Sequence, residues 1–249
     1  MWSGTSMSKV LTCPDDAYRE SGQCSNPVWA DMSVQLMPPL TAAEGVKIGM
    51  AIVLAPTQAV AVVRLNREGE RQFRLMRWGL LPTFVTDPKR FPTLINARSE
   101  TVERRPSFAE SFRRRRCWVL ADGFYEWRSE DGARVPYHIR LPGGRPFAFA
   151  GIWDRAEGRG GPVVSCAILT TRPAPAVAPI HDRMPVLLPA EARDAWLDPS
   201  TDLARLRALM APYAGALEVT RVSARVNAVT NDDAACREPD PAPAETSRP

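Results

Sequence analysis

A series of short strand-like segments in the middle of this chain constrains its fold more than any other feature. The segments are apolar or alternate between apolar and polar residues, and charged or Gly-rich turns such as residues 130–132 and 158–161 separate them. This pattern is typical of β-strands that follow one another in one sheet. The four segments are Cys117 to Trp127, Val135 to Leu141, Pro146 to Trp153 and Val163 to Thr171. The middle of the chain therefore predicts a mostly antiparallel sheet.

Further strands and short helices are predicted on both sides of this stretch. Strands are expected at Ile48 to Leu54, Val60 to Leu65, Arg71 to Leu81 and Leu217 to Val226. Helices are expected from about Ser107 to Arg115, from Pro189 to about Leu197, and from Asp202 to Met210. Ser107 with Glu110 three residues later fits a capping box, and Pro189 suits the first turn of a helix.

Length and charge set broad limits on the kind of protein. The 249 residues, 45% of them apolar, are enough for one large domain or two small ones. The formal net charge is +4, and residues 231–249 carry five acidic residues against two arginines, which leaves +7 on the rest. A polyanion such as nucleic acid is one partner that this charge suggests, and simple solubility is the other explanation. Residues 231–249 are also rich in Pro, Ala and Asp, and we expect them to be disordered.

The cysteines and the apolar runs indicate the cellular compartment of the protein. Five cysteines are widely spaced and form no Cys-x-x-Cys pair, so they predict neither a zinc site nor a disulfide framework. A reducing cytoplasm fits this usage. No apolar run approaches the roughly 18 residues that a membrane span needs, and residues 1–8 lack the features of a signal peptide. We therefore expect a soluble cytoplasmic protein without a metal or an organic cofactor.

The stretch Ala121 to Trp127, which reads Ala-Asp-Gly-Phe-Tyr-Glu-Trp, holds the first candidate for a chemical role. Its Glu126 stands between two aromatic residues, shortly after an Asp-Gly turn. Burying an ionised carboxylate without a partner is costly, so this glutamate is either paired or employed in chemistry with a raised pKa. A glutamate on the wet face of an edge strand is the alternative.

The two histidines of the chain have different interpretations. His181 lies in a loop bracketed by prolines beyond a predicted buried strand, where a catalytic proton carrier could be placed. A loop histidine without a role is the alternative. His138 alternates with Pro136 and Arg140, so an exposed sheet face explains it and no role is assigned to it.

Two polar stretches could contact a substrate. Asn96 and Arg98 are two residues apart in a compact polar stretch. Asparagine can orient a carbonyl or hydroxyl group and arginine can bind phosphate oxygens, although a helix cap or a turn is the simpler explanation. The arginines from Arg113 to Arg116 either complement the negative end of a helix dipole or contact phosphate.

Seven blocks, in order along the chain, together resemble the SRAP family, the SOS-response-associated peptidases that are also called abasic-site processing proteins. The blocks are Ala-Pro-Thr-Gln (55–58), Arg-Trp-Gly-Leu (77–80), Asn-Ala-Arg-Ser-Glu-Thr (96–101), Ala-Asp-Gly-Phe-Tyr-Glu-Trp (121–127), Phe-Ala-Gly-Ile-Trp (149–153), Ile-Leu-Thr-Thr (168–171) and His-Asp-Arg-Met-Pro (181–185). The resemblance runs from about Ile52 to Asn227. It implies one α+β domain, placed at residues 46–230 after an irregular, atypical segment 1–45, with a mostly antiparallel, curved, barrel-like sheet flanked by short helices.

The resemblance also implies a substrate and a chemistry. A basic groove would hold single-stranded DNA near a junction with duplex DNA, and the substrate would be an abasic site whose opened sugar exposes an aldehyde. An N-terminal cysteine would supply the amine for a Schiff base and then the thiol for a thiazolidine crosslink. By this resemblance Asn96 positions the sugar or the chain terminus, Glu126 acts as acid and base, and His181 moves a proton at the sugar ring.

The same resemblance implies residues that hold the DNA. Arg98 matches a position that binds phosphate, and Trp78, Pro56 and Met184 fall in blocks that line the groove. The protein would then be cytoplasmic and associated with the nucleoid when it is bound to DNA.

The sequence departs from the family at its beginning, which reads Met1-Trp2-Ser3 rather than Met-Cys-Gly-Arg. Cys13 and Cys24 lie upstream of Pro56, but an internal cysteine has an amide nitrogen, which cannot form a Schiff base. Cleavage before one of these cysteines, a different native start, and a variant that binds DNA without crosslinking it all stay open.

Three functional hypotheses follow. They are an abasic-site crosslinking enzyme, a non-catalytic binder of single-stranded or junction DNA, and a peptidase that acts on its own N-terminus or on other proteins.

Overall fold

The computed structural model describes residues 54–87, 90–158, 161–231 and 233–240. The strands of this part are β1 (Ala59–Leu65), β2 (Arg71–Trp78), β3 (Asn96–Arg98), β4 (Arg116–Ala121), β5 (Phe124–Glu130), β6 (Ala133–Arg140), β7 (Phe147–Gly158), β8 (Gly161–Thr171), β9 (Met184–Pro185), β10 (Leu187–Leu188) and β11 (Glu218–Arg221). The α-helices are α2 (Pro106–Arg114), α3 (Arg193–Leu197) and α4 (Leu203–Leu209). Short 3₁₀ helices are η2 (Pro142–Gly144), η3 (Ala190–Ala192), η4 (Ala224–Asn227) and η5 (Ala234–Arg237).

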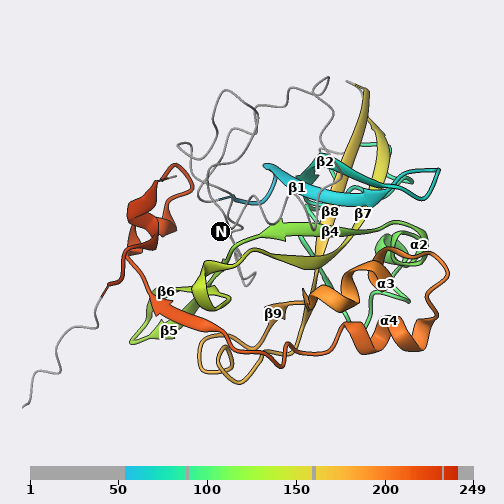
Figure 1. Cartoon of the computed structure of the whole chain (residues 1–249). Coiled ribbons are helices and arrows are strands. Elements are labelled where there is room, and N and C mark those ends of the chain that lie inside the picture. Colours follow the sequence, from blue (N-terminus) through green and yellow to red (C-terminus); the bar gives the residue numbers. More distant parts are fainter. Residues whose placement is uncertain (1–53, 88–89, 159–160, 232, 241–249) are drawn as a thin grey trace, which may run out of the picture.

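The larger of two sheets closes on itself through its two longest strands. β7 pairs with β4 on one side and with β8 on the other, and the order continues from β4 through β1 and β2 back to β8. These five strands form a barrel, which occupies the centre of Figure 1. β8 is parallel to β2 and to β3, and the other described strand pairs are antiparallel. The predicted α+β domain with a mostly antiparallel, barrel-like sheet is confirmed.

The barrel strands carry a different apolar core on each face, because neighbouring side chains of a strand point to opposite sides. The first core joins barrel residues such as Val63 to the helices through Phe112 and Trp196. The second core joins the intervening residues such as Val62 to the smaller sheet through Phe124. It also includes Ile180, from the segment between β8 and β9. The second core is therefore where the barrel, the smaller sheet and that segment meet.

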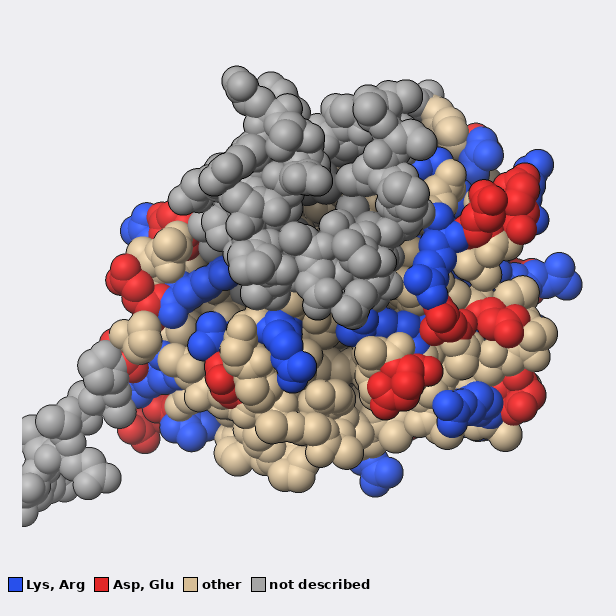
Figure 2. Space-filling model, in the orientation of Figure 1, with Lys and Arg blue, Asp and Glu red and all other residues tan. Residues whose placement is uncertain are grey.

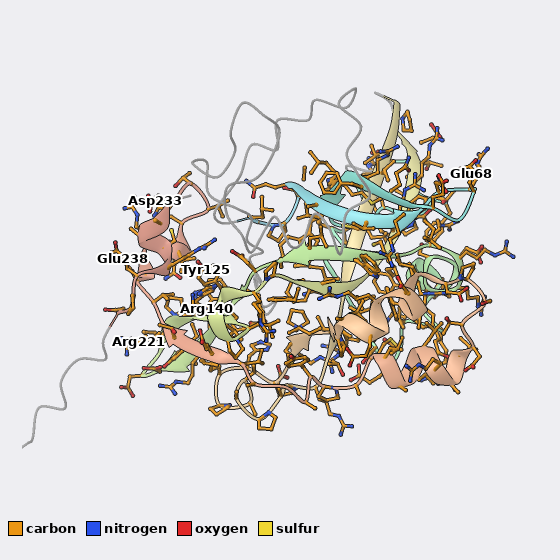
Figure 3. The ribbon with its side chains drawn as sticks, in the orientation of Figure 1. Glu68, Tyr125, Arg140, Arg221, Asp233 and Glu238 are labelled. Carbon is orange, nitrogen blue, oxygen red and sulfur yellow. The ribbon has the colours of Figure 1, made fainter. Side chains whose placement is uncertain are left out.

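The smaller sheet, in the order β11, β6 and β5, has its outer face covered by the end of the chain. Tyr125 and Trp127 of β5 belong to a third apolar cluster with Cys236 of η5. The indole N–H of Trp127 donates to Oδ1 of Asn227 at 2.6 Å, and the hydroxyl of Tyr125 donates to the carbonyl of Cys236 at 3.4 Å. Figure 3 shows Tyr125 beside the C-terminal segment that carries Asp233 and Glu238.

The prediction that residues 231–249 are disordered is wrong for residues 233–240. Asp233 caps η5 by accepting the N–H of Ala235, and its carboxylate forms an ion pair with Arg225 at 2.5 Å. Cys236 is buried, and Pro239 bridges to Val222. The composition of the tail does not reveal that the outer face of β5 supplies these residues with a surface to pack on. Residues 241–249 lie outside the described part.

The beginning of α2 differs from the prediction. Its N-cap is Arg105, Pro106 lies in the first turn, and no side chain caps the helix. The capping box predicted from Ser107 and Glu110 is therefore wrong, because proline opens the helix one residue earlier, where its missing N–H is not needed. The C-terminal helices follow the sequence more closely: Asp202 caps α4 by accepting the N–H of Arg205 at 2.8 Å.

The arginines at the end of α2 are mostly held by protein groups. Arg115 Nε lies 3.3 Å from a carboxylate oxygen of Asp154, and Arg114 Nε lies 3.2 Å from Glu110. Arg116 is buried, and it donates to four carbonyl groups, those of Phe112, Arg113, Trp196 and Asp198. For Arg116 the structure supports the helix-end interpretation, because its guanidinium donates to carbonyl groups at the ends of α2 and α3. For the exposed Arg114 both interpretations stay open.

Several predicted strands differ in extent. The segment Cys117 to Trp127 is divided, because β4 ends at Ala121 and β5 begins at Phe124 in the other sheet. Gly123 lies at this division, where an added Cβ would come within 2.3 Å of Nε2 of His138, so only glycine fits. The last predicted strand is shorter than expected and gives way to η4, and β7 extends beyond Trp153. Most of the strand predicted at residues 48–54 lies outside the described residues.

His138 does not lie on an exposed face, as the sequence suggested. It is only 6% exposed, and its ring centroid lies 5.0 Å from that of Tyr125. Alternation identified its face correctly, but the C-terminal segment covers that face. Burial lowers the pKa of His138 to about 3 and raises the pKa of nearby Asp122 to about 6. Asp122 also lies 3.4 Å from Nη2 of Arg237 on η5, so this buried polar group ties the tail to the start of β5.

These two shifts predict opposing effects of pH on the free energy of unfolding. The folded-state pKa of His138 lies below its ordinary value of 6.5, so its contribution is lost as pH falls from about 6.5 toward 3. The folded-state pKa of Asp122 lies above its ordinary value of 3.8, so its contribution grows as pH falls from about 6 toward 4. We expect a nearly flat profile for the wild type between about pH 6 and pH 4.5 from this pair.

Single substitutions separate the contribution of His138 to the free energy of unfolding from that of Asp122. His138→Gln should become more stable relative to wild type on acidification, and Asp122→Asn less stable, each by up to about 1.4 kcal/mol per pH unit. Urea unfolding at three pH values in this window measures both slopes. Parallel profiles for wild type and both variants would contradict the assignment.

Candidate functional site

The C-terminal end of β8 brings two of the candidate stretches together. On one side β3 runs parallel to it, with Asn96 opposite Ile168 and Arg98 opposite Thr170. On the other side β9 pairs with it antiparallel, with Pro185 opposite Thr170. The strand that begins at Asn96 and the segment that follows His181 therefore flank the same three or four residues of β8.

The carbonyl of Thr170 joins these two stretches directly. It accepts the backbone N–H of Ser99 at 2.9 Å and Nη2 of Arg183 at 2.6 Å. The guanidinium of Arg183 also binds both carboxylate oxygens of Glu100, at 2.6 and 2.9 Å. This hydrogen bonding to Arg183 is the main reason that the pKa of Glu100 is lowered. The turn after β3 and the loop of His181 are thus fixed to one another and to the barrel.

His181 is held through one nitrogen of its ring. Nδ1 accepts the backbone N–H of Arg183 at 3.0 Å and lies 3.2 Å from a carboxylate oxygen of Asp182. The side chain of His181 is 23% exposed. Nδ1 also lies 3.1 Å from the carbonyl oxygen of Arg183, which accepts when Nδ1 carries a proton. The backbone of Arg183 therefore holds the ring through Nδ1, and His181 keeps partial access to solvent, which suits a proton carrier.

Asn96 has a buried amide oxygen that the fold does not use. Oδ1 of Asn96 makes no hydrogen bond within the described residues, although it is shielded from solvent. Burying such an oxygen without a donor costs free energy, and unsatisfied buried polar atoms in native proteins call for an explanation. A position reserved for a substrate group supplies one.

Glu126 comes from the smaller sheet and is 2% exposed. It lies two residues after Phe124 on the same face of β5, opposite Tyr137 of β6. Phe124 belongs to the second core and Tyr137 packs against it. The alternative of a glutamate on the wet face of an edge strand is therefore contradicted.

The three catalytic candidates border one core, although they come from two sheets and a loop. Ile95 precedes Asn96, Ile180 precedes His181, and both belong to the second core with Phe124. The structure joins the stretches of Asn96 and His181 around β8, as described above. The meeting of Glu126 with the other two side chains at one substrate stays a prediction.

The residues expected to hold DNA differ in exposure. Arg98 is exposed at the end of β3, and Pro56 is half-buried in a turn next to β2, where the N–H of Thr57 donates to the carbonyl of Trp78 at 2.7 Å. Trp78 and Met184 are fully buried in the second core. The indole N–H of Trp78 donates to the carbonyl of Ile95 at 2.9 Å, so this tryptophan positions the residue before Asn96. Contacts of these four residues with DNA stay predictions.

The described cysteines are poor nucleophiles. Cys117, Cys166 and Cys236 are all buried free thiols. Burial raises the pKa of Cys117 well above its ordinary value and that of Cys166 to about 12, so the reactive thiolate is disfavoured. Cys13 and Cys24 lie outside the described residues.

No group of three or more His, Cys, Asp or Glu side chains in the described ranges could hold a metal ion. No described helix is both long enough and apolar enough to cross a membrane.

A five-stranded mixed barrel with a three-stranded sheet on one side, and polar residues gathered around the end of β8, defines an α+β domain of one recognisable class. The chain belongs to the SRAP family, since the model of that family, described as SOS response associated peptidase, matches residues 31–229. The resemblance stated from the sequence is confirmed.

Relatives and solved structures agree with this assignment. The chain is 38% identical over 185 residues to the abasic site processing protein YoqW of Bacillus subtilis, covering 72% of this chain and 81% of the relative. It is 34% identical to the abasic site processing protein HMCES of Gallus gallus, covering 68% of this chain and 58% of the relative. A solved structure of a protein from Bacteroides thetaiotaomicron matches with a TM-score of 0.68 at 25% identity, covering 74% of this chain and 82% of that one.

The amide oxygen of Asn96 leads to a prediction about stability. Asn96→Leu should leave the free energy of unfolding unchanged or raise it by up to about 1 kcal/mol, because it removes an oxygen that has no partner in the described fold. Asn227→Ala is the control, since it leaves the N–H of Trp127 without its acceptor and should cost about 1–2 kcal/mol. Urea unfolding gives both values, and a larger loss for Asn96→Leu than for the control would show that Asn96 is structural.

Proposed function

We propose that this protein processes abasic sites in single-stranded DNA by capturing the aldehyde of the opened sugar as a Schiff base. The observation that carries the proposal is the buried oxygen of Asn96, which has no hydrogen-bond partner among the described residues, on the strand whose following turn is anchored to the loop of His181, in a chain of the SRAP family. The names of the relatives, abasic site processing proteins in bacteria and in vertebrates, support the same substrate.

The chemistry needs a primary amine, and few groups of this chain supply one. The amine attacks the aldehyde carbon to give a carbinolamine, which loses water to form the imine. Guanidinium groups do not react in this way at neutral pH because they stay protonated. The printed sequence contains only three lysines, Lys9, Lys47 and Lys89, besides the terminal amine. In a thiazolidine crosslink the thiol of an N-terminal cysteine then adds to the imine carbon, and the amine nitrogen keeps a proton.

Each candidate side chain has a step in this scheme. Glu126, shielded from water, donates a proton to the departing hydroxyl of the carbinolamine and takes a proton back in the reverse direction. The free oxygen of Asn96 accepts a hydrogen bond from the sugar or from the attacking amine. His181 in its imidazolium form transfers the proton on Nε2 to the ring oxygen of the sugar as the ring opens, which leaves a neutral imidazole.

The DNA would lie across an arginine-bearing surface. Every lysine of the printed sequence lies outside the described residues, so the described cations are arginines, which suit phosphate and stack on bases. On the face shown in Figure 2, such blue side chains border the grey atoms, with acidic side chains among them. Arg98, Trp78, Pro56 and Met184 remain our candidates for contact with single-stranded and junction DNA, bound in the cytoplasm at the nucleoid.

A crosslinking assay tests the proposal. Wild-type protein incubated with single-stranded DNA that carries one abasic site should give a heat-stable adduct on a denaturing gel. Glu126→Gln and His181→Gln should each slow its formation by about 100-fold or more, the usual effect of losing a general acid or base. Asn96→Ala should slow it as well, because the sugar or the attacking amine loses its hydrogen-bond acceptor. His138→Gln is the matched control, because it removes the other histidine from the covered face of the smaller sheet and should leave the rate unchanged.

Two further readouts separate the alternatives. Borohydride should trap the imine, and mass spectrometry of the trapped adduct identifies the amine as the chain terminus or one of the three lysines. If protein with a verified N-terminus binds the DNA in a salt-sensitive way and never crosslinks, the non-catalytic DNA binder replaces this proposal. Loss of residues before Cys13 or Cys24, seen in the intact mass, would support self-processing.

A further inference from the structure

A group of exposed arginines extends along the chain from the ends of β3 and β8 to the end of α2. Many other described arginines are held in ion pairs, as Arg114 is by Glu110 and Arg140 is by Glu218. The side chains of this group are exposed, and they make no hydrogen bond or ion pair with any described residue. We call the group the arginine track, and its members are Arg98, Arg104, Arg105, Arg113 and Arg172.

The track begins beside the candidate site. Arg98 ends β3, the strand that begins at Asn96, and it lies opposite Thr170 of β8. Arg172 follows Thr170 by two residues, just beyond the end of β8. Because β3 and β8 are parallel, the two arginines leave the sheet at the same edge. A DNA strand that reaches Asn96 therefore has cations of the track beside it.

The chain then carries the track away from the site through tight turns. The carbonyl of Arg98 accepts the N–H of Thr101 at 3.1 Å, and the carbonyl of Thr101 accepts those of Arg104 and Arg105, both at 3.0 Å. Such turns advance by about 1.5–2 Å per residue, so Arg105 lies at most about 14 Å along this path from Arg98. That length matches about four phosphates of one strand, which are about 3.4 Å apart along the axis of duplex DNA.

The far end of the track gathers around Glu103. The carboxylate of Glu103 forms a bidentate pair with Arg207 of α4, at 2.7 and 2.6 Å. Hydrogen bonding to Arg207 lowers the pKa of Glu103 most, and the charges of Arg207, Arg104 and Arg113 lower it further. These three arginines therefore lie near one carboxylate, and a single negative charge stands among three positive ones.

The acidic residues beside the track are already paired. Both carboxylate oxygens of Glu100 accept hydrogen bonds from Arg183, and Glu110 lies 3.2 Å from Arg114. With Glu103 they are the only acidic residues in the stretch 98–116. A polyanion that approaches this stretch thus meets unpaired cations, and each carboxylate there is already neutralised by an arginine.

The side chains of this stretch favour double-stranded over single-stranded DNA. Proteins that bind a single strand stack its bases on exposed aromatic side chains. The only aromatic residues of the stretch 98–116 are Phe108 and Phe112, and both are buried in the first core. Arginines without such a stacking surface suit the phosphate backbone of a duplex, whose bases stay paired and stacked.

We propose that the arginine track binds the phosphates of double-stranded DNA, the duplex arm of a junction whose single strand enters the candidate site. This role rests on the function proposed above for the position of the single strand. The duplex is held by charge and without a preference for sequence, so its affinity falls as the salt concentration rises.

Two double substitutions provide a test with a matched control. Arg104→Gln with Arg113→Gln removes two charges of the track, and because neither side chain has a hydrogen bond or ion pair with a described residue, the fold should be kept. Arg67→Gln with Arg145→Gln is the control. It removes the same charge from arginines that are likewise exposed and unpaired among the described residues, one in the turn between β1 and β2 and one just before β7.

Fluorescence anisotropy measures binding to two DNAs without an abasic site, a single strand and the same strand continued into a duplex arm. Wild type should bind the junction more tightly than the single strand. The substitutions in the track should weaken junction binding by about tenfold at about 0.1 M salt and lower the slope of log K against log salt by about two, since each phosphate contact contributes about 0.9. Binding of the single strand, and both affinities of the control, should change by less than about twofold.

The possible outcomes separate this inference from the proposed function. Equal losses in the track variant and in the control would reveal a general effect of charge and overturn the inference. Equal losses for the single strand and the junction would overturn it too, because the arginines would then hold the single strand. A junction preference that the track variant loses, in a wild type that forms no adduct with abasic DNA, supports the track and refutes the proposed function. Adduct formation together with an unaltered junction affinity in the track variant does the reverse.

Discussion

The pairing of β8 with partners on both of its edges is the interaction on which the rest of this structure depends. Its residues from Gly161 to Ile168 pair with β7, which closes the barrel, while its other edge runs parallel first to β2 and then to β3. Parallel neighbours cannot be joined by a tight hairpin, so the chain must travel between them. Asn96 begins β3, one of the two parallel neighbours of β8, and His181 lies in the segment between β8 and β9.

The two cores differ in the groups that surround them. The first core is covered by α2, α3 and α4. The buried Arg116 ties the ends of α2 and α3 together through four carbonyls. The second core is bordered by Glu126, which is 2% exposed, and by the buried Oδ1 of Asn96, which makes no hydrogen bond within the described residues. Burial of that oxygen opposes folding unless it meets a donor. Packing of the helices on the first core stabilises the fold, and this offsets the cost of burying polar groups beside the second core.

The sequence predicted the elements better than it predicted how they meet. Alternation and turn residues located most of the strands, and seven motifs in order identified the family. The Asp-Gly turn at residues 122 and 123 was recognised, but the change from one sheet to the other at that turn was missed, because Gly123 is required by the approach of His138, a residue that lies fifteen positions later. The exposed setting predicted for His138 failed for the same reason, since only the packed chain shows that residues 233–240 cover it. Likewise, no local signal pairs Glu100 with Arg183, although both stand inside motifs that the sequence revealed.

Gly123 also explains how Glu126 comes to border the second core. The turn at Asp122 and Gly123 takes the chain out of the barrel, so that β5 begins at Phe124 in the smaller sheet and does not extend β4. Strand period then places Tyr125 and Trp127 on the outer face and Glu126 on the inner one. On this outer face Trp127 donates a hydrogen bond to Asn227, and Tyr125 donates one to Cys236. A shift of β5 by one residue would break both hydrogen bonds and expose the two aromatic rings. The end of the chain therefore fixes the register that keeps the carboxylate of Glu126 on the side of the site.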